Sequence, residues 1–196
     1  FNEKRALRIV ADTALTSFYC YAFFIKISGY ALFSKLDQNL SQVWQKIFQG
    51  EPYDYSFVLS PNDLYLYFLK RDSGNLLMYE LDASTGLATK MVTRSSTTVY
   101  TSSQIFVTPD SNNIYITVYL SQGQVCKWTR GTSIIDCYFF QGIASVPQIV
   151  IPINNDEIIM TALETESNNL NNYRLNITNN GACIWRSSIS CVSSDC

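Results

Sequence analysis

The chain has 196 residues, of which 47% are hydrophobic and 15% are charged, so it can bury a sizeable core. Its net charge of −2, with no Lys/Arg cluster beyond Lys4-Arg5, argues against nucleic acid as a partner. It contains no histidine, which removes the commonest general base, the commonest metal ligand and the usual partner of a catalytic Ser or Cys. We therefore expect no catalytic residue, no metal site and no cofactor.

The first half of the chain is a series of short apolar runs separated by Asn, Asp, Ser and Gly, which is typical of strands joined by turns. The most apolar window, 18–33, carries Lys26, Ser28 and Gly29, so it predicts two adjacent strands and no membrane span. The run 64–69 is nearly continuous, as expected for a strand covered on both faces. The segment 5–12 could be a short amphipathic strand or one turn of helix, and we favour the strand. The expected strands are therefore 5–12, 18–25, 30–36, 43–48, 55–59, 64–70, 76–81 and 87–92.

The second half repeats this pattern after a polar run at 95–103, which we interpret as a flexible connection or a hydroxyl-glycosylated one. The turn Ser60-Pro61-Asn62-Asp63 has a counterpart in Thr108-Pro109-Asp110-Ser111, and this match is the strongest local evidence of repetition. The expected strands are 104–108, 113–120, 125–129, 136–140, 148–151, 157–163, 170–177 and 182–187.

A repeat of about 47 residues runs through the chain. Leu36-Asp37, Leu81-Asp82, Trp128-Thr129 and Leu175-Asn176 follow one another at spacings of 45, 47 and 47 residues. A period of that size predicts an all-β, β-propeller-like array of about four four-stranded antiparallel blades. We expect one domain over 1–188, with blades at 5–50, 51–94, 95–142 and 143–188, and a cysteine-containing tail at 189–196. Four blades can close into a small ring or form part of a larger one completed by further sequence or another chain, and the pattern leaves both open.

Several segments resemble the blade pattern of quinoprotein-like and YVTN-type β-propellers. They are Leu81-Asp82-Ala83-Ser84-Thr85-Gly86, the turn at 60–63 with Leu64-Tyr65-Leu66 after it, and the strand at 42–46 after Leu36-Asp37. The resemblance spans residues 6–188. Dehydrogenases of the quinoprotein kind also carry tryptophan docking motifs and an axial pocket for calcium and cofactor. The glycine and tryptophan positions here do not match well enough to carry over any cofactor residue, and the Gly-His and Trp-Asp signature of WD repeats is absent.

The cysteines and two glycosylation triplets bear on the compartment. The cysteines are Cys20, Cys126, Cys137, Cys183, Cys191 and Cys196, and no pair has the two-residue spacing of a zinc site. We expect disulfides, first Cys126–Cys137 across adjacent strands of one hairpin, then Cys183–Cys191, with Cys20 pairing to Cys191 or Cys196. Reduced thiols in a cytosolic protein are the alternative.

The triplets Asn39-Leu40-Ser41 and Asn176-Ile177-Thr178 are candidate N-glycosylation sites. The chain begins at Phe1 without a recognisable signal peptide, so we interpret it as a mature or trimmed form. With the disulfides, these features predict an extracellular or cell-surface glycoprotein.

Two groups of side chains are functional candidates. The first is a set of turn carboxylates that could bind calcium or form an acid and base pair, although solvated turn-capping is the stronger interpretation; they are Asp54, Asp63, Asp72, Asp82, Asp110, Asp156 and Glu157. The second is a set of aromatic residues that could stack on sugars, although core packing is favoured; they are Trp44, Trp128, Trp185, Tyr65, Tyr67, Tyr115 and Tyr119.

The preferred function is a non-enzymatic extracellular or cell-surface protein whose propeller is a platform for protein or glycan contacts. Its partners would be other proteins or further copies of itself, in an oligomer or a fibre built through strand edges. One alternative is a propeller-type enzyme, such as a glycosidase, lyase or quinone-dependent dehydrogenase, with axial carboxylates. Another is a cytosolic propeller scaffold.

Overall fold

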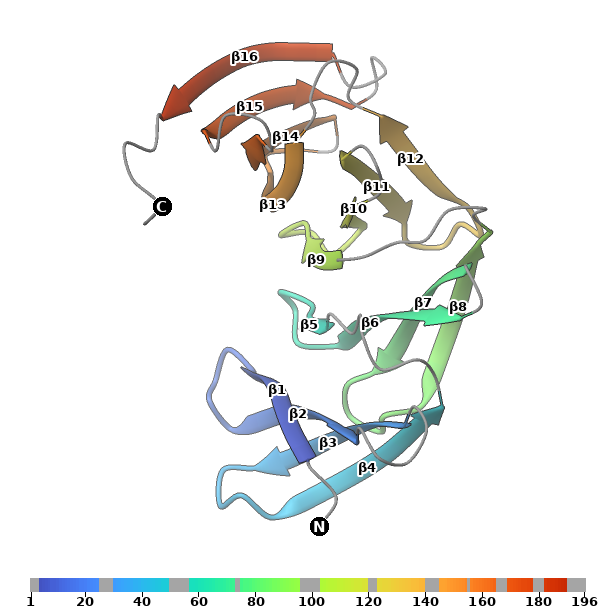
Figure 1. Cartoon of the computed structure of the whole chain (residues 1–196). Helices are drawn as coiled ribbons and strands as arrows, with labels where there is room; N and C mark the ends of the chain where they lie inside the picture. The colour runs from blue at the N-terminus through green and yellow to red at the C-terminus, as the bar shows by residue number, and fades with distance from the viewer. Residues whose placement is uncertain are drawn as a thin grey trace. The chain divides into compact units, whose positions relative to one another are not determined.

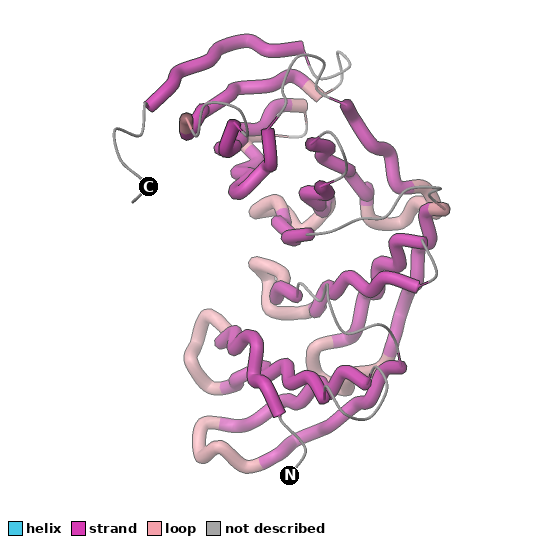
Figure 2. The backbone as a smooth tube through the Cα atoms, in the orientation of Figure 1, coloured by secondary structure: helices cyan, strands magenta, loops and turns pink. Residues whose placement is uncertain are grey.

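A computed structural model describes the chain over residues 4–24, 30–49, 57–72, 75–95, 103–119, 123–139, 145–154, 156–164, 169–177 and 182–189. These residues form sixteen strands in four antiparallel sheets, each a meander of four consecutive strands (Figures 1 and 2). The chain divides into two compact units, Phe1–Thr97 and Thr98–Cys196. Each unit holds two of the four sheets.

Unit 1 contains the first two sheets. The first is built from β1 (Lys4–Ala11), β2 (Ser17–Phe24), β3 (Tyr30–Asp37) and β4 (Gln42–Gln49). The second is built from β5 (Phe57–Leu59), β6 (Tyr65–Asp72), β7 (Asn75–Asp82) and β8 (Ala88–Arg94). Consecutive strands pair in register, from Phe18↔Leu36 in the first sheet to Leu66↔Leu81 in the second.

Unit 2 contains the other two sheets. The third is built from β9 (Ser103–Val107), β10 (Asn113–Tyr119), β11 (Gly123–Thr129) and β12 (Ile135–Phe139). The fourth is built from β13 (Ser145–Pro152), β14 (Glu157–Glu164), β15 (Leu170–Asn176) and β16 (Ala182–Ile189). The predicted all-β class and the four four-stranded antiparallel sheets are therefore confirmed.

The strand limits differ from the expected ones at a few positions. Leu64 was expected to begin a strand, but it lies in the turn before β6 and is exposed, whereas Leu66 to Leu69 are buried. Arg71 and Asp72 were expected in a turn, but they extend β6 and pair with Leu76 and Asn75. Pro152 was also expected in a turn and instead ends β13, an edge strand of its sheet, where a missing N–H leaves no ladder bond unmade.

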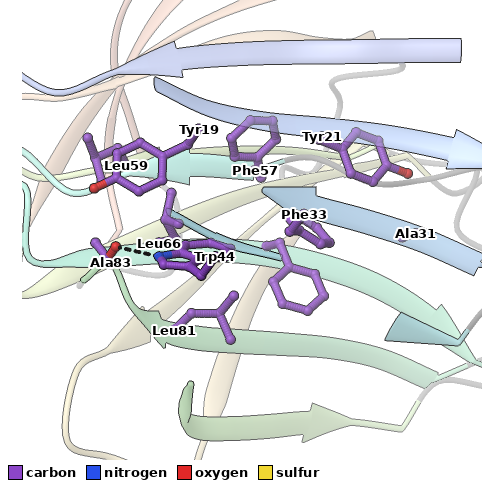
Figure 3. Packing of buried hydrophobic residues seen from close by; sticks show 11 residues of the cluster. Tyr19, Tyr21, Ala31, Phe33, Trp44, Phe57, Leu59, Leu66, Leu81 and Ala83 are labelled. Carbon is purple, nitrogen blue, oxygen red and sulfur yellow. Dashed lines mark hydrogen bonds between the residues drawn. The ribbon is translucent and has the colours of Figure 1, made fainter. Parts of the chain in front are cut away.

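An aromatic core joins the two sheets of unit 1 (Figure 3). Phe33 of β3 lies 4.6 Å, centroid to centroid, from Phe68 of β6 and 5.9 Å edge-on from Phe57 of β5. Phe68 in turn stacks on Tyr79 at 4.6 Å with an interplanar angle of 4°. Ring pairs in these geometries add to the free energy gained by burying their area. The buried members are Tyr19, Tyr21, Ala31, Phe33, Trp44, Phe57, Leu59, Leu66, Phe68, Leu81 and Ala83.

A largely aliphatic core joins the two sheets of unit 2. Val150 of β13 pairs in register with Met160 of β14, and both side chains are buried together with Val125 of the third sheet. The members are Tyr115, Val125, Val150, Ile158, Met160, Ala162, Tyr173, Leu175 and Ile177. In both units the core lies between facing sheets, because residues of one parity along each strand point to the neighbouring sheet.

The described part of the chain includes no helix with the length and apolar character required to span a membrane. The apolar window 18–33 is instead divided between β2 and β3, as expected from the charge and glycine within it.

Candidate functional site

The well-described turns of each unit form what we call its turn rim. In a four-stranded meander the first and third turns lie at the same end of the sheet, because the strand direction reverses at each turn. The turn rim of unit 1 comprises residues 12–16, 38–41, 60–64 and 83–87, and that of unit 2 comprises 108–112, 130–134, 153–154 and 156. All the described turn carboxylates weighed above lie on or beside these rims, except Asp72 in β6.

The repeated turns in the second and third sheets share one hydrogen-bond design. The Ser60 hydroxyl donates to Asn62 Oδ1 at 2.7 Å and accepts from the Tyr65 amide at 2.9 Å. The Thr108 hydroxyl likewise donates to Asp110 Oδ1 and accepts from the Asn113 amide at 3.0 Å. This arrangement satisfies the backbone of the turn locally, so the repeated Ser/Thr-Pro-Asn/Asp pattern builds architecture.

Asp82 organises the turn between β7 and β8. Its Oδ1 accepts from the Ser84 amide and hydroxyl at 2.9 and 2.6 Å, and from the Thr85 amide and hydroxyl at 2.8 and 3.0 Å. The Ser84 hydroxyl bond, followed by the bonds from Thr85 and the Ser84 amide, holds the pKa of Asp82 below its ordinary value of 3.8. The carboxylate is therefore fully ionised at neutral pH and engaged within its own turn.

Two hydrogen-bonded contacts connect the first sheet to the turns of the second sheet. Asp63 Oδ2 accepts from the Thr13 backbone amide at 3.0 Å and from the Thr13 hydroxyl. The Trp44 indole Nε1 of β4 donates to the Ala83 carbonyl at 3.2 Å (Figure 3). Asp63 has a φ of +58°, and the equivalent turn positions Leu15 and Ser111 have φ values of +56° and +59°.

Gly86 lies directly against the Trp44 ring. Its φ is +68°, and a Cβ built on it would lie 2.8 Å from Trp44 Cδ2 and Cε3. No side chain fits there without moving the buried indole. This pair was missed from the sequence, where we judged that the glycine and tryptophan positions fitted no docking pattern. The available signal was the Thr-Gly after Leu81-Asp82, which needed the sheet-to-sheet geometry to point to Trp44.

Tyr19 lies behind the turn rim of unit 1. Burial, together with the negative charges of Asp12, Asp63 and Asp82, raises its pKa to about 12. The Lys35 ammonium lies 5.4 Å from the centre of the Tyr19 ring. A phenol with a raised pKa stays protonated at neutral pH, so it is available for hydrogen bonding and not as a base.

The turn rim of unit 2 contains a pocket. A pocket of about 290 Å³ opens between the β9–β10 and β13–β14 turns, lined by Thr108, Pro109, Asp110, Ile153 and Asn154. Asp110 Oδ1 accepts from Thr108 and from the Asn112 amide, and the Thr108 bond leads the causes that lower its pKa. Asn154 Oδ1 accepts from the Asp156 and Glu157 amides at 2.8 and 2.9 Å. All three polar lining residues, Thr108, Asp110 and Asn154, are thus already engaged in hydrogen bonds.

The turn carboxylates do not gather into a reactive group. Within the described ranges no set of three or more Asp, Glu or Cys side chains is arranged to hold a metal ion. Glu157 pairs with Arg174 at 2.6 Å on the surface of the fourth sheet. Asp54 lies outside the described residues, and Asp72 is placed by its backbone pairing with Asn75. Asp82 and Asp110 fit the turn-capping interpretation, whereas Asp63 accepts from Thr13 of another turn.

The cysteines are partly placed. Cys126 of β11 and Cys137 of β12 face each other in register and form a disulfide, in the hairpin where we expected them to pair. Cys20 is half-buried and forms no disulfide with any cysteine that the structure describes, and burial raises the pKa of its thiol. Cys183 lies in β16, while Cys191 and Cys196 lie outside the described residues, so the Cys183–Cys191 pair and a tail partner for Cys20 stay predictions.

The two candidate glycosylation residues differ in setting. Asn39 is exposed in the β3–β4 turn, where its backbone amide donates to Asp37 Oδ1 at 2.8 Å. Asn176 is the half-buried last residue of β15, and the Thr178 of its triplet lies outside the described residues. Asn39 is the more accessible acceptor of the two, and glycosylation of either stays a prediction.

Most of the aromatic candidates belong to the interior. Trp44, Trp128, Tyr67 and Tyr115 are buried, as the core interpretation expected. Trp128 Nε1 donates to the Thr132 carbonyl within its own hairpin. Tyr65 is half-buried at the start of β6, Trp185 of β16 is exposed, and the Tyr119 side chain lies outside what the structure describes.

The fold was compared with known proteins. No family model and no curated protein matches the sequence. Among solved structures, the Dos1 propeller is similar with a TM-score of 0.66 and 10% identity, over 93% of this chain and 46% of that one. TolB from Acinetobacter baumannii has a TM-score of 0.62 and 17% identity, over 99% of this chain and 45% of that one. A GH43 β-1,3-galactosidase has a TM-score of 0.59 and 10% identity, over 95% and 46% of the two chains.

These likenesses define the fold class. The chain has a β-propeller-like fold and spans about half the length of the propeller proteins it resembles. One of those three proteins is named for an enzymatic reaction and the other two are not, so fold similarity alone does not assign or exclude catalysis. Any function must be argued from the side chains above.

Proposed function

We propose that the protein is a non-enzymatic, extracellular or cell-surface platform that binds proteins or glycans, other copies of itself included. The observation that carries this proposal is the use of the turn carboxylates. Asp63, Asp82 and Asp110 each accept hydrogen bonds from backbone amides and hydroxyls of the rims. An enzyme with its active site on the propeller axis would instead need these carboxylates to point at a substrate. With no histidine in the chain, the usual activated nucleophile is also missing.

The covalent chemistry supports the extracellular part of the proposal. A disulfide between Cys126 and Cys137 persists in oxidising surroundings and is uncommon in the cytosol. Asn39 is exposed in a turn, which is where an N-linked glycan is tolerated. The packing of Trp44 on Gly86 between two sheets supports the finer proposal that the blades are of the quinoprotein-like repeat type, kept for architecture without the cofactor.

Intact-mass measurement on protein made in a secretory host tests the proposal. We expect a mass gain of about two hydrogens per disulfide on reduction under denaturing conditions, and a loss of hexose-containing mass after glycan removal that disappears in Asn39→Gln. Asn62→Gln, in a turn without an acceptor triplet, is the matched control. Fully reduced cysteines with no attached sugar in secreted material would overturn the extracellular assignment and favour the cytosolic scaffold.

The non-enzymatic part needs its own test. A panel of glycosides and polysaccharides, assayed for release of reducing ends or unsaturated products, should show no turnover above buffer. Turnover that is lost in Asp63→Asn or Asp110→Asn, with the fold retained by circular dichroism, would overturn it in favour of the propeller-type enzyme. Either asparagine still accepts the turn hydrogen bonds, so it separates chemistry from folding.

A further inference from the structure

The turn rim of unit 1 presents one exposed leucine in each of its four turns. Leu15, Leu40, Leu64 and Leu87 are 66%, 67%, 56% and 59% exposed, and they lie in the β1–β2, β3–β4, β5–β6 and β7–β8 turns in that order. A single exposed leucine is ordinary on a protein surface, but turns favour Gly, Pro, Asn, Asp and Ser. A leucine in every turn of one rim therefore requires an explanation. We call these four residues the leucine patch.

Direct contacts join the four turns of this rim into one continuous surface. Ser17, which follows the β1–β2 turn, pairs with Asp37, which precedes the β3–β4 turn. The Asp63 bond to Thr13 joins the β1–β2 turn to the β5–β6 turn. The Ala83 amide donates to the carbonyl of the leucine in the β5–β6 turn at 2.9 Å, which joins that turn to the β7–β8 turn. The leucines therefore belong to one surface within unit 1.

Two members of the leucine patch have a backbone conformation that leucine disfavours. The φ values of Leu15 and Leu40 are +56° and +62°. In this left-handed region a bulky side chain is rare, and glycine is accommodated without a steric cost. Folding of the turns alone would thus be served better by glycine at both positions. The leucine side chains are better explained by a contact that they make with another molecule.

All the charges in these turns are negative. Residues 12–16, 37–41, 60–64 and 82–87 contain four aspartates and no Lys, Arg or Glu; the aspartates are Asp12, Asp37, Asp63 and Asp82. Lys35 lies behind the rim, where its ammonium is 5.4 Å from the centre of the Tyr19 ring. The turn rim of unit 2 differs, because it exposes Ile134 and Ile153 but carries Arg130 as well as acidic residues. The leucine patch thus combines exposed aliphatic groups with charge of one sign.

We propose that the leucine patch binds a protein segment that presents Lys or Arg beside aliphatic side chains. The aliphatic groups of the segment would cover the leucines, and its cations would face the rim carboxylates. This inference rests on the proposed function, which it deepens by naming the binding surface and the chemistry of the protein partner.

The chemistry of the rim argues against three other occupants. A second copy that used the same rim would bring four carboxylates against four more, because a two-fold contact sets identical surfaces against each other. An anionic lipid surface would be repelled in the same way, since it attracts basic segments. A sugar would be expected to stack on an aromatic ring, and residues 12–16, 37–41, 60–64 and 82–87 include no Phe, Tyr or Trp.

The experiment measures binding of labelled synthetic peptides to the full chain by fluorescence anisotropy. Three peptides of equal length are compared: one of Leu and Lys, one of Leu and Glu, and one of Ser and Lys. The protein carries Asn39→Gln throughout, because a glycan on Asn39 would lie beside Leu40. We expect the Leu/Lys peptide to bind, with an affinity that falls as the salt concentration rises. The other two peptides should bind at least about tenfold more weakly.

Leu15→Gly and Leu40→Gly test the surface directly. Each should weaken binding of the Leu/Lys peptide by about three- to tenfold, because it removes an apolar side chain that the peptide would cover. Neither should lower the denaturation midpoint, because glycine adopts a positive φ without strain. Weaker binding with retained stability separates a binding role from a structural one. The matched control is Ile47→Ser in β4, which alters an isoleucine that is 66% exposed outside the rim and should leave binding unchanged.

Four results would overturn the proposal. Absence of saturable binding of the Leu/Lys peptide would remove the cationic partner, and equal affinity for the Leu/Glu peptide would remove the role of charge. Binding unchanged in both glycine variants would place the peptide elsewhere. A dimer in sedimentation velocity that is lost in Leu15→Gly and Leu40→Gly would assign the leucine patch to a second copy. The intact-mass and turnover assays do not depend on these leucines, so failure here is distinguishable from failure of the proposed function.

Discussion

Each of the two units consists of two four-stranded antiparallel sheets, but the contacts that hold the two sheets together differ between the units. Unit 1 has a core of stacked aromatic rings, a tryptophan seated on a glycine turn, and a hydrogen-bonded tie from Asp63 to Thr13. Unit 2 has an aliphatic core, a disulfide within the third sheet, and a 290 Å³ pocket between its turns. At the position of Asp63 it has Ser111, whose buried hydroxyl has no hydrogen-bond partner among the described residues.

This difference shows which parts of the repeat carry architecture. The Ser60 and Thr108 turns keep the same hydrogen bonds although the contacts between sheets have diverged. The repeated turn therefore specifies where a strand ends, and the contacts between sheets decide how firmly each pair is held. Four variants test this comparison, beginning with the one of largest expected effect.

Trp44→Ala should destabilise unit 1 most. It removes a buried indole and its hydrogen bond to the Ala83 carbonyl, and truncation of a large buried aromatic residue costs about 3–5 kcal/mol. Denaturant unfolding followed by circular dichroism measures the loss. Trp185→Ala, at a half-exposed tryptophan, is the control and should cost less than about 1 kcal/mol at protein concentrations where the chain is monomeric. Equal losses at the two positions would contradict the role of Trp44 between the sheets.

Replacement of both Cys126 and Cys137 by alanine should act on unit 2. The bridge closes a short loop, with a sequence separation of 11, and loss of such a bridge costs about 2–4 kcal/mol. Thermal unfolding under non-reducing conditions measures the change. Cys20→Ala, at a cysteine without a disulfide to any described residue, is the control and should change stability much less. A double variant as stable as the parent would mean that the third sheet does not depend on the bridge.

Gly86→Ala should cost about 1–3 kcal/mol because the added methyl overpacks the Trp44 ring. Gly131→Ala is a matched control, since Gly131 also has a positive φ, of +92°, but nothing lies within 4 Å of its Cβ position. The difference between the two variants isolates the contact from the backbone strain. In the Trp44→Ala background Gly86→Ala should lose most of its effect, and full additivity of the two changes would argue against the contact.

Asp82→Asn should have the smallest effect, and its difference in stability from the parent should be present at neutral pH and disappear in acid. Because the folded pKa of Asp82 is held below 3.8, chiefly by the Ser84 hydroxyl, its contribution to stability is present above pH 3.8. That contribution is lost as the pH falls through the lower folded value. The variant should therefore flatten the acid limb of a stability-against-pH curve, and Ser84→Ala should flatten it partly. An acid limb unchanged in Asp82→Asn would show that this carboxylate gains nothing from its turn.

The strands were predictable because their signals are local. Many of the apolar runs end near Pro, Gly, Asn or Asp, as at Pro61 and Pro109, and these residues set the turn whatever the surrounding fold. The Cys126–Cys137 pairing was foreseeable for the same reason, since both residues belong to one hairpin. The extension of β6 through Arg71 and the end of β13 at Pro152 could not be foreseen, because pairing with the next strand determines where each strand ends.

The contacts between sheets could not be predicted from the sequence pattern. Trp44 and Gly86 meet only because two sheets pack, and neither residue's neighbours indicate the other. The engagement of the turn carboxylates was expected from turn chemistry, whereas the Asp63 bond to Thr13 joins two turns of different sheets. One packing feature is visible in the sequence. In β2, Phe18 and Cys20 are as apolar as Tyr19 and Tyr21, so both faces of this strand are apolar.

The most direct test of the contrast between the units is peptide-resolved hydrogen exchange of the intact chain with and without reductant. We predict that reduction of Cys126–Cys137 accelerates exchange in β11 and β12 while β3, β6 and β7 keep their protection. This result would show that the third sheet needs an oxidising compartment, in agreement with the proposed extracellular role. Equal acceleration in both units, or none in β11 and β12, would contradict the view that the two sheet pairs are held by different means.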